Sequence, residues 1–483
     1  MALIQVARLA EGRLASRLLF HRARAKPNFR GTLCMRTTTS TTASTPTTTS
    51  TRVASEEHNG IVSRGGIGGG AKGKAHAGGF TGAGGSSPTK KGVFAGGVEM
   101  PFTSHLRIVD PANSPIWPVY RVLDDDGLVR TDATDPDLSR EIALKIYGNM
   151  VRLEAMDDIF YNAQRQGRMS FYMQSAGEEA LQMGGAAALH LNDEAFAQYR
   201  EPGLLMWRDF GIQGFADQCL SNESDLGKGR QMPVHYGSKE LHYQTVSSPL
   251  GTQIPQAVGA GYALKLSGKD NIAVCYFGDG AASEGDFHAA LAMAATRDVP
   301  VLFICRNNGY AISTSVTDQY RGDGIVSRAS GYGMHGIRVD GNDALAMYAA
   351  TAEARRLCLA ERKPVLMEAM TYRLGHHSTS DDWSRYRSSS EVKQWKTGHH
   401  PIRRLFAYLE HKGWWDDAQD RQLRDKERVS VLNALETAER KAKPPFGTMF
   451  DDVYKAIPPH LREQREHLES HLKKHAGCYD QSP

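Results

Sequence analysis

The chain has 483 residues, with 58 Lys and Arg against 54 Asp and Glu and a formal charge of +4. This length exceeds one ordinary domain of ~100–200 residues, and a hydrophobic content of 40% excludes a wholly disordered chain. The sequence has no run of 18 apolar residues, so it predicts no transmembrane helix.

The positive charge belongs to the N-terminal part of the chain. Residues 1–54 carry nine Lys and Arg and one acidic residue, for +8, and residues 55–98 carry +3, which leaves −7 on residues 99–483. A slightly acidic body gives no electrostatic support for nucleic-acid binding. The six cysteines form neither a C-x-x-C pair nor a zinc spacing, which favours a reducing compartment without disulfides.

Residues 1–54 have the composition of an organelle transit peptide. Apolar residues recur at helical spacing among five arginines, residues 37–51 are almost all Ser or Thr, and Glu11 is the single acid. An ordinary disordered tail is the alternative, and composition does not decide between mitochondrion and plastid. Residues 55–98 are predicted to be a Gly-rich flexible linker, because residues 59–97 hold 15 Gly in 39 and few large apolar side chains.

From residue 99 the pattern becomes globular. The predicted elements, in chain order, are a helix over 138–166, a strand over 272–277, a helix over 283–296, strands over 299–305 and 337–339, a helix over 343–361, a strand over 364–370 and mostly helix over 402–476. Strand, loop, helix and strand in succession indicate a parallel α/β sheet. We therefore predict an α/β domain over 99–400 and a helical C-terminal extension over 401–483.

Polar residues follow two of these strands directly. Gly278-Asp279-Gly280 ends one apolar run, and Asn307-Asn308 follows the next. The carboxyl ends of parallel strands line the ligand crevice of such a sheet, and a carboxylate, an amide oxygen and a carbonyl suit Mg²⁺. The glycines allow close approach of a phosphate, and the helix beginning near Ser283 offers N–H groups to it. Alone, G-D-G is usually only a turn.

The pairing of G-D-G with N-N resembles the thiamin diphosphate motif, in which Asp279, Asn308 and the backbone oxygen of Tyr310 would hold Mg²⁺. Further blocks stand in the order of one family: Gln198–Glu201, Gly227–His235, Ser247–Gln256, Arg306–Ser313 and Thr371–Asp382. Over residues 100–480 the chain is similar to the alpha subunits of branched-chain 2-oxoacid dehydrogenase decarboxylases. This resemblance implies a doubly wound, mainly parallel sheet, the thiamin diphosphate-binding fold, with helical N- and C-terminal extensions.

The resemblance also implies the cofactor-binding residues. They are Gln198, Tyr199, Arg200, Ser248, Leu250, Gly278, Asp279, Gly280, Ala281, Arg306, Asn308, Tyr310 and His377. An Arg fork suits phosphate because it donates two parallel hydrogen bonds. An exposed pair at a helix end is the alternative for Tyr199 and Arg200, and Leu250 alone would be assigned to the core.

A structural potassium site is implied at Ser247, Pro249, Thr252 and Gln253. The alternative is a turn that caps a helix starting near Gln253.

The adjacent His376 and His377 do not predict zinc, because no third ligand stands at metal spacing. In the family the second histidine reaches the cofactor. His377 is therefore the candidate catalytic residue that stabilises and protonates the reacting carbon, with Arg373 beside it.

Ser378 and Ser388 match two phosphorylation sites of related proteins. A phosphate beside His377 would add about −1.5 to −2 charges next to a bound diphosphate, and would repel cofactor or disorder the loop. The alternative is a solvated Ser-rich turn.

The chain has one strand–helix–strand unit of this kind. Thiamin catalysis normally needs a second α/β module, which supplies the glutamate that activates the cofactor. The resemblance implies a beta subunit in an α₂β₂ heterotetramer, a lipoyl acyltransferase core, a dedicated kinase and phosphatase, and a location in the mitochondrial matrix.

The expected activity is oxidative decarboxylation of branched-chain 2-oxo acids. Alternatives are a pyruvate dehydrogenase alpha subunit, a catalytically dead scaffold, and a nucleotide-binding module, which lacks its phosphate loop here.

Overall fold

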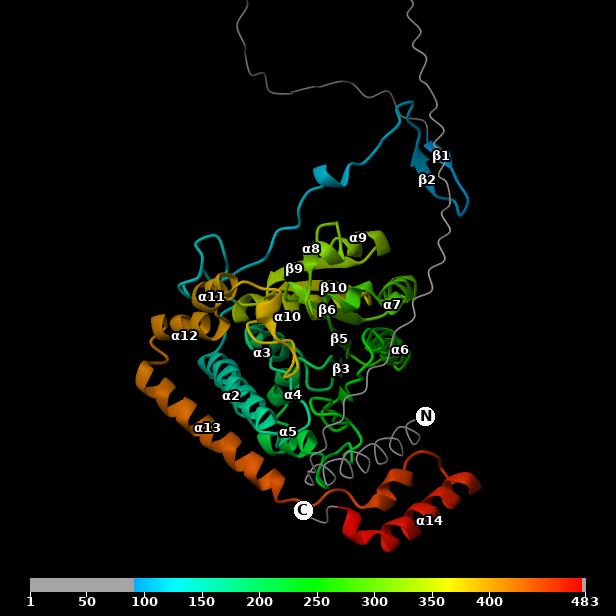
Figure 1. Cartoon of the computed structure of the whole chain (residues 1–483). Coiled ribbons are helices and arrows are strands. Elements are labelled where there is room, and N and C mark those ends of the chain that lie inside the picture. Colours follow the sequence, from blue (N-terminus) through cyan, green and yellow to red (C-terminus); the bar gives the residue numbers. More distant parts are fainter. Residues whose placement is uncertain (1–90, 480–483) are drawn as a thin grey trace, which may run out of the picture. The chain divides into compact units, whose positions relative to one another are not determined.

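The computed structural model describes residues 91–479, and the chain divides into two compact units, the first ending at Thr103 and the second beginning at Ser104 (Figure 1). The predicted transit peptide, 1–54, and residues 55–90 of the predicted linker lie outside the described residues.

The end of the predicted linker forms a β-hairpin in the first unit. Strand β1 (Lys91–Val93) pairs antiparallel with β2 (Glu99–Pro101). Gly96 and Gly97 form its turn with φ of 84° and 76°, a conformation that glycine adopts without strain. The structure thus differs from a flexible linker at 91–98, because these two glycines lie between residues that can pair as strands.

The second unit is built on a six-stranded parallel sheet in the order β4-β3-β5-β6-β10-β9. Its strands are β3 (Glu194–Phe196), β4 (Tyr243–Gln244), β5 (Ala273–Gly278), β6 (Val301–Asn307), β9 (His335–Asp340) and β10 (Val365–Met370). The predicted strands are confirmed, with bounds shifted by at most two residues. The sheet confirms the expected parallel α/β class.

Helices cover both faces of the sheet, as doubly wound topology requires (Figure 1). Alternate residues of β5 enter different hydrophobic clusters, Val274 and Tyr276 on one face and Cys275 and Phe277 on the other. The α-helices and the remaining short strands are α2 (Arg140–Arg165), α3 (Glu179–Ala188), α4 (Pro202–Trp207), α5 (Ile212–Cys219), α6 (Gln253–Leu266), α7 (Gly285–Thr296), β7 (Tyr310–Ala311), β8 (Thr314–Ser315), α8 (Val316–Gln319), α9 (Arg328–Tyr332), α10 (Ala344–Ala360), α11 (Ser389–Gly398), α12 (Pro401–His411), α13 (Asp417–Glu439) and α14 (Pro459–Lys474).

Short 3₁₀ turns complete the elements: Pro111–Asn113, Ala281–Ser283, Trp383–Arg385, Phe446–Phe450 and Ala476–Cys478. The predicted helix over 138–166 is α2, and that over 343–361 is α10, whose first N–H groups are capped by the Asp343 carboxylate. The predicted helix over 283–296 is divided at Glu284, between a 3₁₀ turn and α7.

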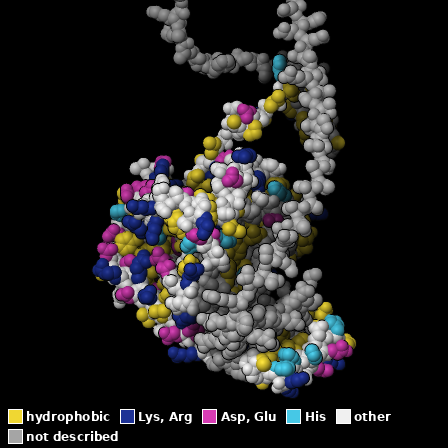
Figure 2. Space-filling model, viewed as in Figure 1, with side chains coloured by type: hydrophobic (Ala, Val, Ile, Leu, Met, Phe, Trp, Pro, Cys, Tyr) yellow, Lys and Arg dark blue, Asp and Glu magenta, His cyan; other side chains and the backbone are white. Residues whose placement is uncertain are grey.

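The C-terminal helices α12 and α13 pack on the α/β body. Leu405 and Leu435 lie in the same hydrophobic cluster as α2, and buried Glu427 of α13 accepts two hydrogen bonds from Arg152 of α2, at 2.7 and 3.1 Å. Figure 2 shows positive and negative side chains interspersed over α11, α12 and α13 on the face drawn. In the part of the chain that the structure describes, no helix is both long and apolar enough to cross a membrane.

Candidate active site

The candidate site lies where β5 and β6 end. These strands pair in parallel with Gly278 opposite Arg306, so Asp279 and Asn308 leave the sheet at the same edge. The Asp279 carboxylate is buried and accepts a hydrogen bond of 2.7 Å from the amide of Gln319. Burial raises its pKa above the usual range, and the Gln319 amide, Arg306 and the backbone N–H of Asn308 oppose that rise.

Asn308 is buried with its amide held from both sides. Its Nδ2 donates to Glu178 at 2.7 Å, and its Oδ1 accepts a longer bond of 3.3 Å from the backbone N–H of Tyr310. The Tyr310 carbonyl accepts a 3.5 Å bond from Arg373. Among the described residues, no three His, Cys, Asp or Glu side chains cluster as metal ligands. The candidate magnesium ligands are instead one carboxylate, one amide oxygen and one carbonyl, a hard oxygen set.

The glycines around Asp279 leave room at the strand end. A Cβ on Gly280 would lie 2.6 Å from the Cβ of Ala311, so a larger residue does not fit there. The Gly278 N–H donates to the buried amide oxygen of Gln198 at 2.9 Å, which places this predicted residue against the turn. Ala281 is buried at the start of the following 3₁₀ turn.

Buried guanidinium groups of Arg200, Arg306 and Arg373 surround this edge. Burial opposes the charge of Arg306, but the buried carboxylates of Glu178 and Glu201 raise its pKa above the ordinary value. Its Nε donates to Glu201 at 2.8 Å and lies 3.2 Å from a Glu178 oxygen. Burial lowers the pKa of Arg200, whose fork binds the carbonyls of Gln174 and His377.

His377 lies between two of these arginines. Its Nδ1 is 3.1 Å from an Arg200 nitrogen and 3.4 Å from an Arg373 nitrogen. Since guanidinium groups only donate, Nδ1 is an acceptor and the ring proton belongs on Nε2. Burial, followed by the charges of Arg200 and Arg373, lowers the pKa of His377 to about 3. The imidazole is therefore neutral at physiological pH.

The charges of this site fit a metal-bound diphosphate. After burial, the charges of Arg200 and Arg373 lower the pKa of His377, and an anion beside these arginines would balance those charges. The buried Asp279 carboxylate receives one side-chain N–H in return, and a cation would offset its burial. Arg forks and the N–H groups of a glycine turn are suitable phosphate donors.

Three other predicted cofactor-binding residues, Tyr199, Ser248 and Leu250, are less buried than Asp279 and Asn308. Tyr199 is half-buried, with its ring edge-on to His377 at 6.1 Å between centroids. Ser248 and Leu250 are exposed, and the Ser248 hydroxyl lies 2.6 Å from Nε2 of His235.

The predicted potassium ligands are brought together in part. The Thr252 hydroxyl lies 3.2 Å from the Pro249 carbonyl and 3.4 Å from the Ser247 hydroxyl. Gln253 begins α6, near the predicted start, but no side chain caps this helix, and Gln253 donates its amide to the Tyr276 carbonyl at 3.0 Å. The Gln253 amide nitrogen is thus hydrogen-bonded to strand β5.

The loop after His377 is fixed at its far end by Arg387. This buried guanidinium donates to the carbonyls of Arg373 and Gly375, the second at 2.7 Å. Four aromatic rings lie 5.3–5.7 Å from it, those of Tyr310, Tyr372, Trp383 and Tyr386.

The two predicted phosphorylation sites differ in exposure. Ser378 is buried, and its hydroxyl accepts a 3.2 Å bond from the Ser380 N–H. Ser388 is exposed and caps α11, where its hydroxyl accepts from the Glu391 N–H at 3.1 Å.

The sequence did not predict the groups that hold the candidate ligands, namely Glu178, Glu201 and Gln319. Glu201 ends the Gln198–Glu201 motif, but no role was predicted for it. A weak signal exists for Glu178, since Glu178-Glu179 precedes a helix rich in Ala, Met and Gly, where a carboxylate needs a partner. Gln319 gives no such signal.

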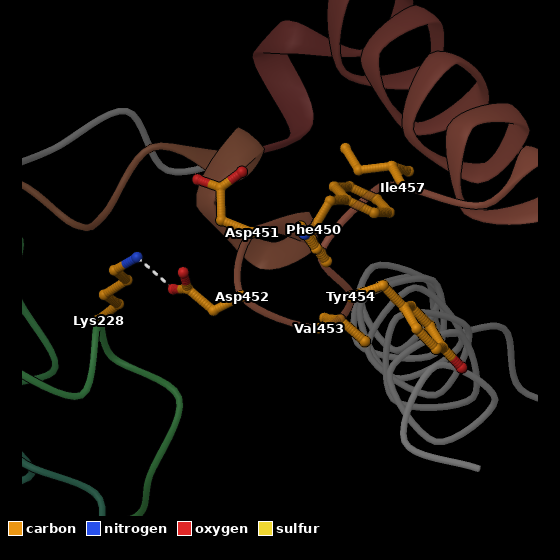
Figure 3. A pocket seen from close by; sticks show the side chains of 8 residues that line it. Lys228, Phe450, Asp451, Asp452, Val453, Tyr454 and Ile457 are labelled. Carbon is orange, nitrogen blue, oxygen red and sulfur yellow. Dashed lines mark hydrogen bonds and ion pairs between the residues drawn. The ribbon is translucent and has the colours of Figure 1, made fainter.

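A hollow of about 750 Å³ lies away from this site (Figure 3). It is lined by Lys228, residues 450–455 and Ile457, and Lys228 forms an ion pair with Asp452. None of the predicted site residues lines this hollow, so it is not part of the candidate active site.

Comparison with known proteins gives one consistent family. Residues 147–446 match the model of the dehydrogenase E1 component. The chain is similar to the mitochondrial 2-oxoisovalerate dehydrogenase subunit alpha of Homo sapiens, at 53% identity over 79% of this chain and 86% of the relative. It is also similar to subunit alpha 2 of Arabidopsis thaliana, at 52% over 80% and 82%, and to the Dictyostelium discoideum subunit, at 53% over 75% and 82%.

The low pKa of His377 predicts a pH-dependent cost to stability. The unfolded chain gains a proton on this residue as the pH falls below about 6.5, whereas the folded chain gains it only near 3. The free energy of unfolding should therefore fall between pH 7 and pH 5, by at most ~1.4 kcal/mol per pH unit from this group. His377→Asn keeps an acceptor for the arginines and should show a smaller fall in urea denaturation. Equal pH dependences for the two proteins would contradict the assignment.

Proposed function

This chain belongs to the dehydrogenase E1 component family, and from that premise we propose that it is the alpha subunit of a mitochondrial branched-chain 2-oxoacid dehydrogenase. Its thiamin diphosphate-dependent activity is the oxidative decarboxylation of 2-oxoisovalerate and related branched 2-oxo acids. The acyl group passes to a lipoyl domain. Relatives named for 2-oxoisovalerate support this substrate class over pyruvate. Their mitochondrial names and the composition of residues 1–54 support import into the matrix.

The observation that carries the proposal is the meeting of Asp279, Asn308 and buried arginines at one strand edge. Asp279, Asn308 and the Tyr310 carbonyl would hold Mg²⁺, while Arg200 and Arg306 would bind the diphosphate. When bound, thiamin diphosphate supplies the electron sink for decarboxylation. A potassium ion at Ser247, Pro249, Thr252 and Gln253 would stabilise the loop that precedes α6.

His377 would act as the proton donor near the reacting carbon. Its Nδ1 faces Arg200 and Arg373, so Nε2 carries the proton that can be donated. Neutralising those two charges with an anion would raise the pKa of His377 from about 3, while burial would still hold it below the ordinary value. Arg373 is held by Ile312 and Tyr386 and orients the imidazole.

The beta subunit would supply the second module. The chain has one unit in which G-D-G and N-N end neighbouring strands, and the relatives are named subunit alpha. We therefore include the α₂β₂ assembly and an acyltransferase core that carries lipoyl domains in the proposal. A dedicated kinase and phosphatase would act on Ser378 and Ser388.

Co-expression with a beta subunit tests the function directly. The purified alpha chain alone should release no CO₂ from 2-oxoisovalerate, because the cofactor-activating glutamate lies on the partner. The assembled enzyme, with thiamin diphosphate and Mg²⁺, should release it and should prefer 2-oxoisovalerate to pyruvate. Full activity of the isolated chain would contradict the division into two subunits, and a preference for pyruvate would contradict the substrate class.

Asp279→Ala should abolish Mg²⁺-dependent binding of thiamin diphosphate, because it removes the one carboxylate of the candidate metal site. Asp286→Ala is the matched control, since this exposed aspartate lies on α7 of the same strand–helix unit. Isothermal titration calorimetry of the assembled enzymes should give no binding for the first variant and ordinary binding for the second. Undiminished affinity in Asp279→Ala would sink the metal-site assignment.

Ser378→Glu should reduce turnover strongly, whereas Ser388→Glu should have little effect. The buried Ser378 adjoins His377, so a carboxylate there needs the loop to open, while Ser388 is exposed at a helix start, which favours negative charge. Lipoyl-dependent turnover and tryptic cleavage after Arg385 are the measurements, with Ser378→Ala as the control that retains activity. If Ser378→Glu behaves like Ser388→Glu, the loop is only a polar turn.

A further inference from the structure

Glu178 stands between the two kinds of ligand group in this site. It immediately precedes α3, its side chain is fully buried, and its carboxylate contacts Asn308 at 2.7 Å and Arg306 at 3.2 Å. It therefore contacts one candidate metal ligand and one candidate diphosphate ligand.

The contact with Asn308 fixes which end of the amide faces the metal position. Nδ2 donates to Glu178, so Oδ1 points away from this carboxylate. The Oδ1 atom accepts only the long 3.3 Å bond from Tyr310 and keeps a lone pair for a cation. Turning the amide over would set its oxygen against the Glu178 carboxylate, two acceptors without a hydrogen between them.

The neighbouring asparagine is held in the same manner by a different glutamate. Asn307 donates its Nδ2 to Glu368 at 2.8 Å. Glu368 also accepts from the N–H groups of Ile325 and Val326 and pairs with Arg338, so its role in the fold is evident.

Glu178 accepts fewer hydrogen bonds than Glu368, and one of its carboxylate oxygens accepts none. Its Oε2 is buried without a hydrogen-bond donor, because the single Nε–H of the facing Arg306 is directed at Glu201. A buried carboxylate oxygen without a donor destabilises the fold. Oε2 therefore has only the ion pair with Arg306, whereas Oε1 accepts the hydrogen bond of the Asn308 amide.

We infer that Glu178 is a positioning residue for the metal: it orients the Asn308 amide so that Oδ1 is presented to Mg²⁺. The inference rests on the proposed function, in which Mg²⁺ and thiamin diphosphate bind at this edge. The charge of Glu178 also pairs with Arg306, which keeps Glu201 as a hydrogen-bonded partner when Glu178 is removed.

The test compares Glu178→Ala with Glu178→Gln in the assembled α/β enzyme. Glutamine can still accept from Asn308, and its Nε2 would occupy the place of the oxygen that lacks a donor. At saturating thiamin diphosphate, the Mg²⁺ concentration for half-maximal binding, followed by circular dichroism or tryptophan fluorescence, should rise about tenfold or more in Glu178→Ala. Glu178→Gln should stay within about threefold of the unmodified enzyme, because the acceptor is retained.

Two controls separate positioning from folding and from charge. Glu179→Gln alters the adjacent buried glutamate, which binds the Gly177 N–H, and should leave the Mg²⁺ dependence unchanged. Inorganic diphosphate without Mg²⁺ should bind both Glu178 variants no more weakly than the unmodified enzyme, because a negative charge has been removed. If Glu178→Ala does not assemble, Glu178→Met, of similar length and without an acceptor, replaces it.

An unchanged Mg²⁺ dependence in Glu178→Ala would overturn the inference, as would an equal shift in Glu178→Gln. Both results presuppose that the unmodified enzyme binds thiamin diphosphate with Mg²⁺. Failure of that binding would overturn the proposed function itself, so the two failures are distinguishable.

Discussion

The parallel pairing of β5 with β6 is the constraint on which the site depends. Because Gly278 lies opposite Arg306, the residues that follow leave the sheet together, and an aspartate and an asparagine meet in a buried place. Burial makes each unpaired charge costly, so the neighbouring elements supply partners. Gln319 binds the carboxylate and Glu201 binds the guanidinium, each brought there by the loops at the same edge.

This dependence explains why the cluster is charged yet closely packed. Arginines from three segments of the chain converge there, and the charges of Arg200 and Arg373 add to burial in lowering the pKa of His377. The guanidinium groups are held by carbonyls and carboxylates in advance, which would preorganise them for the proposed diphosphate.

Much of this could be predicted from the sequence, for local reasons. Two uninterrupted apolar runs predict buried parallel strands, and polar residues directly after each run must lie at the shared edge, which places Asp279 and Asn308. The partners could not be predicted in that way, since 130 positions separate Glu178 from Asn308. Tertiary packing of α3 against α10, α4 and α2 is what places Glu178 beside Asn308. The hairpin at 91–101 was missed because its high glycine content outweighed a two-glycine turn that favours pairing.

The aromatic surroundings of Arg387 have a consequence for how the loop after His377 can move. One guanidinium binds two carbonyls at the beginning of this segment, and rings from both sides of the loop and from the Asn308 strand end pack on it. Releasing either end of the loop exposes the same charge and the same rings. The segment should consequently open as one cooperative local-unfolding unit, with amide protons that exchange together, instead of fraying from one end.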